Sequence, residues 1–109
     1  MTAPLEIDAL VDAPGLRVAG ELDASNVADL ASRLDGLVAG DDITLDLTGL
    51  EFIDSAGMNA LITVARNLGE GSRMTMRVLK EGPVRRVIDL MGIADVLDTV
   101  VLVEPEGEG

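Results

Sequence analysis

Hydrophobic and polar residues alternate in several stretches of the chain, and this period of two is typical of β-strands. The alternating stretches cover residues 5–10, 16–22, 42–48 and 74–79, and an apolar run rich in β-branched residues at 96–103 predicts a final strand. Asp12-Ala13-Pro14-Gly15 separates the first two stretches; proline suits one turn dihedral, and glycine can supply a positive φ. We therefore expect the first two strands to form a β-hairpin.

Between these strands, apolar residues recur at helical spacing in three segments. The stripes consist of Val27, Leu30, Ala31, Leu34 and Leu37 or Val38; of Met58, Leu61, Ile62, Ala65 and Leu68; and of Val84, Val87, Ile88 and Met91. Ser25 is a suitable N-cap for the first helix, and Pro83 fits the first turn of the third. Glycine is expected to end the helices, at Gly40, Gly69 and Gly92.

The resulting order, ββαβαβαβ, predicts an α/β fold in which helices pack against a mixed β-sheet. The strands at 43–48 and 74–78 should be parallel neighbours, because the helix between them makes a right-handed crossover. Residues 49–54 are expected to form a connection. A chain of 109 residues fits a single domain at 1–109, with a core from about 5 to 103 and a frayed acidic tail at 104–109.

The chain contains neither cysteine nor histidine. Their absence excludes disulfides, thiolate metal sites and Ser-His-Asp triads. No glycine-rich motif that cradles phosphate is present, so we expect no cofactor and no metal. The remaining enzymatic hypothesis pairs Ser55 with Lys80 as its base. We expect instead a protein that has no catalytic residues and is not an enzyme.

The formal net charge is −12, from 20 acidic and 8 basic residues. Such a balance disfavours binding to nucleic acid and to anionic membranes, so protein partners are expected. The acidity has two open explanations, namely solubility and steering toward a basic partner. The N-terminus lacks the features of a signal peptide, and no stretch approaches the ~20 apolar residues of a membrane span, which predicts a cytoplasmic protein.

Asp54-Ser55-Ala56-Gly57 lies where the chain enters the second predicted helix. One interpretation makes Ser55 the N-cap, with Asp54 adding negative charge at the positive end of the helix dipole. However, a glycine within a helix costs about 1 kcal/mol relative to alanine, so Gly57 indicates a requirement other than helix stability. A missing side chain there would let another backbone or a nucleotide-bound partner approach the serine. Both interpretations remain open from the residues alone.

Gly20-Glu21-Leu22-Asp23, followed by the segment Ile43 to Met58 that contains Asp54-Ser55-Ala56-Gly57, resembles the STAS domain of bacterial anti-sigma factor antagonists. The resemblance extends from about Leu5 to Val103. In that family an ATP-dependent anti-sigma factor kinase phosphorylates the motif serine, and a PP2C-type phosphatase removes the phosphate. By the motif match that serine is Ser55. Ala56 stands where serine or threonine is also common, which removes a rival acceptor.

The resemblance implies an interaction switch in transcription regulation. The unphosphorylated form binds the anti-sigma factor kinase, which carries the nucleotide, and releases the sigma factor; the phosphorylated form does not bind. The implied partner-binding residues are Asp23, Ala24, Ser25, Asp54, Ala56, Gly57 and Met58. The alternative is a STAS scaffold that is not phosphorylated and serves a sensory or lipid-transport complex.

Overall fold

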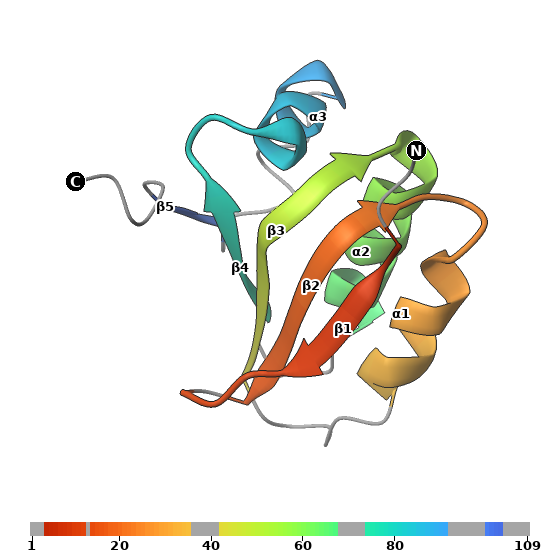
Figure 1. The fold of residues 1–109 in the computed structure, drawn as a ribbon, viewed down its shortest axis with the longest axis vertical. Helices are drawn as coiled ribbons and strands as arrows, with labels where there is room; N and C mark the ends of the chain where they lie inside the picture. Colours follow the sequence, from red (N-terminus) through yellow and green to blue (C-terminus); the bar gives the residue numbers. More distant parts are fainter. Residues whose placement is uncertain (1–3, 13, 36–41, 68–73, 92–99, 104–109) are drawn as a thin grey trace.

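A computed structural model of the protein describes residues 4–12, 14–35, 42–67, 74–91 and 100–103 (Figure 1). Its elements are β1 (Glu6–Ala9), β2 (Gly15–Leu22), α1 (Val27–Asp35), β3 (Ile43–Ile53), α2 (Ser55–Asn67), β4 (Met74–Leu79), α3 (Pro83–Met91) and β5 (Val100–Val103). The predicted ββαβαβαβ order is confirmed. The predicted helix-ending glycines Gly40, Gly69 and Gly92, residues 96–99 of the predicted last strand and the predicted tail at 104–109 lie outside the described residues.

The five strands form one mixed sheet in the order β1-β2-β3-β4-β5. β1 is antiparallel to β2, and the other three neighbouring pairs are parallel. Ile43 pairs with Met74 and Asp46 with Arg77, which confirms that these two segments are parallel neighbours joined through α2. α1 and α2 lie together against one face of the sheet (Figure 1).

The turn between β1 and β2 depends on a glycine. Gly15 has a φ of +150°, and a Cβ atom built on it would lie 1.8 Å from the backbone oxygen of Thr44. No other residue fits there without moving β3 away. The Leu10 N–H donates to the Gly15 carbonyl at 3.1 Å, which closes the predicted hairpin.

β3 is longer than predicted, because the segment expected to be a connection from residue 49 continues the strand to Ile53. The pairing of β3 with β2 shifts twice, between Arg17 and Ala19 and between Gly20 and Glu21. Each shift inserts an extra β3 residue opposite β2, as in a β-bulge. Both bulges interrupt the alternation of polar and apolar residues after residue 47, which is why the sequence pattern ended there.

One hydrophobic core lies between the sheet and the helices. It is built from aliphatic side chains and methionine: Leu16, Val18, Leu22, Leu30, Leu34, Leu45, Leu47, Leu50, Ile53, Met58, Leu61, Ile62, Met74, Met76, Val78, Val84 and Ile88. Val84 and Ile88 bring α3 into this core, and Leu30 and Leu34 bring in α1. The one aromatic residue of the chain, Phe52, is not part of it.

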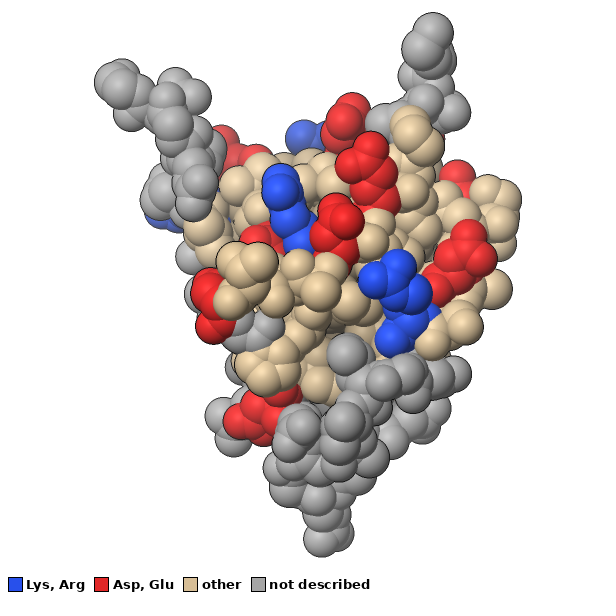
Figure 2. Space-filling view, turned by 60° about the horizontal axis from the view of Figure 1, so that its bottom comes forward, with Lys and Arg blue, Asp and Glu red and all other residues tan. Residues whose placement is uncertain are grey.

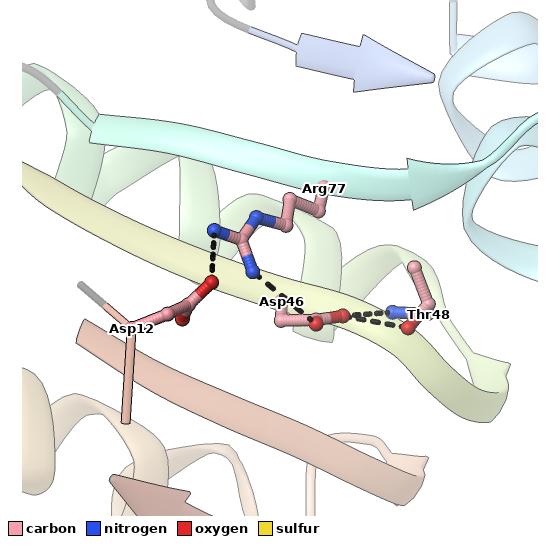
Figure 3. A network of polar contacts seen from close by, with 4 residues as sticks. All are labelled: Asp12, Asp46, Thr48 and Arg77. Atoms are coloured by element: carbon pink, nitrogen blue, oxygen red, sulfur yellow. Dashed lines mark hydrogen bonds and ion pairs between the residues drawn. The ribbon is translucent and has the colours of Figure 1, made fainter. Parts of the chain in front are cut away.

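The face of the sheet opposite α2 carries a polar network (Figure 3). Arg77 of β4 forms ion pairs with Asp12 of the hairpin turn at 3.3 Å and with Asp46 of β3 at 3.7 Å. The other carboxylate oxygen of Asp46 accepts hydrogen bonds from the Thr48 N–H at 3.0 Å and from its hydroxyl at 2.6 Å. These contacts link the hairpin turn to β3 and β4.

Acidic side chains are spread over the face that is seen when the lower edge of the sheet in Figure 1 is turned forward (Figure 2). Basic side chains lie among them rather than in a separate field. This face therefore carries no single acidic patch, and the excess of negative charge does not by itself mark it as an interface.

Candidate functional site

The two sequence motifs lie side by side at one edge of the sheet. β2 and β3 are parallel and end together, with Leu22 paired to Ile53. The Asp54 N–H then donates to the Leu22 carbonyl at 3.3 Å, which ties the start of α2 to the end of β2. The turn after β2 and the entry to α2, about 30 positions apart in the chain, thus form one surface. We call it the Ser55 edge, consisting of residues 21–26 and 51–56.

Asp54, not Ser55, caps α2. The Asp54 carboxylate accepts a hydrogen bond from the Gly57 N–H at 2.8 Å, which is the bond that an N-cap side chain makes to the third helical residue. The Asp54 carbonyl accepts from the Met58 N–H at 3.0 Å, as the first helical bond. The interpretation of Ser55 as the N-cap is therefore wrong, because Ser55 is already the first residue of the helix.

The Ser55 side chain is exposed, and within the described part of the chain its hydroxyl has no hydrogen-bond partner. The first N–H groups of any helix have no partner in the helix itself. The bonds of Asp54 and Gly57 satisfy their own N–H groups, which leaves those of Ser55 and Ala56 at the positive end of the helix dipole. A hydroxyl here is open to a modifying enzyme and stands where an anion is favoured.

Hydrogen bonds fix the neighbouring turn from Asp23 to Asn26. The Asp23 carboxylate accepts from the Ser25 N–H at 2.9 Å and from the Ser25 hydroxyl at 2.6 Å. Asn26 locks both sides of the turn, accepting from the Asp23 N–H at 3.0 Å and donating to the Glu21 carbonyl at 2.9 Å. Ser25 was expected to cap α1, but its hydroxyl serves Asp23 and α1 begins at Val27.

This turn also changes the acidity of Asp23. The hydrogen bond from the Ser25 hydroxyl, followed by the one from the Ser25 N–H, lowers the pKa of Asp23 below its usual 3.8, because both bonds favour the ionised form. Asp23 is therefore a fixed negative charge at neutral pH, beside the α2 entry. Ala24 and Ser25 are exposed on the same turn.

The expected partner-binding residues of α2 divide into two groups. Ala56 is half-buried, whereas Gly57 is buried and Met58 is fully buried in the core. A Cβ atom on Gly57 would lie 3.1 Å from the Leu22 carbonyl oxygen and 3.1 Å from an Ile53 side-chain carbon. The missing side chain thus lets α2 sit close against the ends of β2 and β3. Gly57 and Met58 position Ser55 and do not themselves reach the surface in this conformation.

Phe52 was not among the predicted site residues, yet it is 45% exposed at the Ser55 edge. The sequence feature that could have indicated it is that Phe52 is the only aromatic residue of the chain. Asn26 was missed as well. Its position between a predicted strand and a predicted helix was the signal that could have indicated a turn-fixing role.

The described residues also line shallow hollows away from this edge, among them two that do not include Ser55. One lies at the start of α3 and is lined by both basic and acidic residues, namely Lys80, Glu81, Gly82, Arg85, Arg86 and Asp89. The other lies beside α1 and is lined by Leu5, Ile7, Asp29, Ser32 and Arg33. Among the described residues, no group of three or more Asp or Glu side chains is arranged to hold a metal ion. In the same part of the chain, no helix is long and apolar enough to cross a membrane.

The fold and this edge define a small α/β domain whose distinctive feature is an exposed serine hydroxyl at a helix start. A family model described as "Mlab, STAS domain" matches residues 5–104, so the chain belongs to the STAS domain family. The crystal structure of an anti-sigma factor antagonist from Mycobacterium paratuberculosis is similar, with a TM-score of 0.75 and 20% sequence identity over 94% of this chain and 92% of that chain. At this identity the likeness establishes the fold alone. No curated protein sequence matches the chain significantly.

Proposed function

We propose that this protein is a cytoplasmic anti-sigma factor antagonist, without catalytic activity, whose partner binding is switched off by phosphorylation of Ser55. In the unmodified state it binds an anti-sigma factor serine kinase and frees the sigma factor. A PP2C-type phosphatase restores this state. Membership of the STAS family and the solved anti-sigma factor antagonist of the same fold support this role.

The exposed Ser55 hydroxyl is the observation that carries the proposal. Because Asp54 caps the helix, the serine has no structural task that would keep its hydroxyl engaged. A phosphate on the first residue of α2 would meet the positive end of the helix dipole and the N–H groups of Ser55 and Ala56. We therefore expect the modified protein to keep its backbone, so that the effect falls on the partner interface.

The partner's nucleotide supplies the repulsion that switches binding. Transfer of a phosphoryl group requires the serine oxygen to lie in line with the γ-phosphate of the bound ATP. After transfer, phosphoserine faces the β-phosphate of ADP. Two like unit charges ~5 Å apart repel by about 3 kcal/mol at an effective dielectric of 20. Since about 1.4 kcal/mol changes affinity tenfold, repulsion alone accounts for a weakening of about a hundredfold.

The contact surface consists of the exposed parts of both turns. Asp23, Ala24 and Ser25 lie on one turn, and Asp54 and Ala56 lie beside Ser55 on the other. Gly57 and Met58 belong to the site through packing, because they hold the α2 entry against the strand ends.

The test incubates the purified protein with ATP and each anti-sigma factor kinase of the source organism, and follows intact mass. We expect one added phosphoryl group on the unmodified protein and none on Ser55→Ala. Ser32→Ala is the matched control, since it removes another exposed serine, on α1 and outside the Ser55 edge, and should still be phosphorylated. Phosphorylation of Ser55→Ala would refute the proposal. Equal affinity of the kinase for the phosphorylated and unmodified proteins would favour the STAS scaffold instead.

A further inference from the structure

We infer that Phe52 is an apolar anchor of the Ser55 edge, inserting into an apolar pocket of the partner that is rimmed by lysine or arginine. The inference rests on the proposed function, because it names the chemistry by which the same partner recognises the unmodified protein. It concerns a residue that lies outside the phosphorylation motif.

Phe52 is one of three large apolar residues that the described part of the chain leaves exposed, with Val11 and Leu90, and it is the aromatic one. The core is built entirely from aliphatic side chains and methionine, and the single aromatic residue lies outside it with 45% of its surface exposed. Aromatic side chains are enriched at interface hot spots, because they bury a large area with little loss of conformational freedom. An exposed phenylalanine is therefore better explained by a contact with a partner than by the packing of this chain.

A β-bulge places this side chain. Gly20 pairs with Leu50, whereas the next residue, Glu21, pairs with Phe52, so that Glu51 is the inserted residue. Leu50 and Ile53 both reach the core, and this leaves Glu51 and Phe52 exposed between them. Bulges commonly re-aim side chains beside functional sites. Here the bulge turns Phe52 outward only three residues before Ser55.

The residues next to Phe52 indicate the chemistry of the partner surface that contacts it. Glu51 precedes it in the bulge, Glu21 is its partner across the strands, and Asp54 follows two residues later. An aromatic residue flanked by acidic residues, along the strand and across it, is complementary to an apolar pocket with cationic groups at its rim. This arrangement disfavours a second copy of the same chain as the occupant, because its Ser55 edge would bring like charges together.

The experiment measures the affinity of full-length variants for the kinase that phosphorylates Ser55, by calorimetry in the presence of ADP. Phe52→Ala should weaken binding by about 10- to 100-fold, as expected for truncation of a hot-spot residue. Phe52→Leu, which keeps apolar bulk, should lose less. Val11→Ala is the matched control, since Val11 is fully exposed at the opposite end of the sheet and should change affinity by less than about twofold. Thermal unfolding checks that each variant is folded.

Phe52→Trp adds a direct readout, because the chain contains no other tryptophan and no tyrosine. Its emission should shift to shorter wavelength when the kinase binds, and should stay unchanged when Ser55 carries phosphate. Affinity of Phe52→Ala within about twofold of the unmodified protein would overturn the inference and leave the proposed function standing. An unmodified protein that binds none of the kinases would overturn the proposed function, and this inference with it.

Discussion

Replacing Asp54 with alanine tests which side chain caps α2. The substitution removes the carboxylate that accepts the Gly57 N–H at 2.8 Å and the negative charge at the helix start. Loss of an N-cap costs about 0.5 to 2 kcal/mol, and loss of the charge adds about 0.3 to 1 kcal/mol. We therefore expect Asp54→Ala to lower the free energy of unfolding by about 1 to 3 kcal/mol, which corresponds to roughly 4 to 24 °C in Tm.

Two further variants separate the contributions. Asp54→Asn keeps an oxygen acceptor and loses only the charge, so its cost should be about 0.3 to 1 kcal/mol. Ser55→Ala removes a hydroxyl that has no partner among the described residues, so its effect should stay within about 0.5 kcal/mol. Urea unfolding followed by far-UV circular dichroism suits a chain without tryptophan or tyrosine. If Ser55→Ala costs as much as Asp54→Ala, the serine hydroxyl caps the helix and the reasoning fails.

Three other predictions address the charged groups. Because the folded-state pKa of Asp23 is lowered, the stability that its ionised carboxylate contributes is complete above pH 3.8 and is lost as the pH falls through the folded pKa. The difference in unfolding free energy between the unmodified protein and Asp23→Asn should therefore shrink only below about pH 3.8. Ser55→Asp should weaken kinase binding less than phosphorylation does in calorimetry, because it carries one charge rather than nearly two. Arg77→Gln should lower the unfolding free energy in urea by less than about 1 kcal/mol, since both ion pairs are partly exposed.

The sequence predicted the order of the elements and the parallel pairing of β3 and β4, because these depend on local periodicity and on the handedness of crossovers. It did not predict that β3 runs on to Ile53. A bulge is set by pairing with another strand, in this case β2, and it disturbs the period of two from which strands are recognised. The same pairing places Phe52, so its exposure could not be read from the alternation.

The motif predicted where the site lies, but not which of its side chains caps α2. Asp54 and Ser55 are both good N-cap residues, and a shift of one position exchanges their roles. That choice depends on which residue is the last of β3. The strand ends at Ile53, and the hydrogen bond from the Asp54 N–H to the Leu22 carbonyl holds the next residue at the end of β2. Likewise, the sequence made Ser25 a suitable cap for α1. In the structure, hydrogen bonds of Asp23 and Asn26 place Ser25 inside a turn that precedes the helix.

Two explanations are possible for the glycine at position 57, in the first turn of α2. One is close packing within this chain, and the other is room for a partner. The ideal Cβ position of Gly57 lies 3.1 Å from the Leu22 carbonyl oxygen, from the Leu22 side chain and from Ile53, so a methyl group would push the helix off the strand ends. That movement would lengthen the hydrogen bond from Asp54 to Leu22, which already measures 3.3 Å.

Overpacking costs about 1 to 3 kcal/mol, against a gain of up to about 1 kcal/mol from the higher helix propensity of alanine. We therefore expect Gly57→Ala to lower the free energy of unfolding in urea by about 1 to 2 kcal/mol, and to slow phosphorylation of Ser55 because the serine is displaced. A Gly57→Ala variant that is as stable as the unmodified protein but binds the kinase more weakly would contradict the packing explanation. In that case the glycine leaves room for the partner, and its packing against Leu22 is incidental.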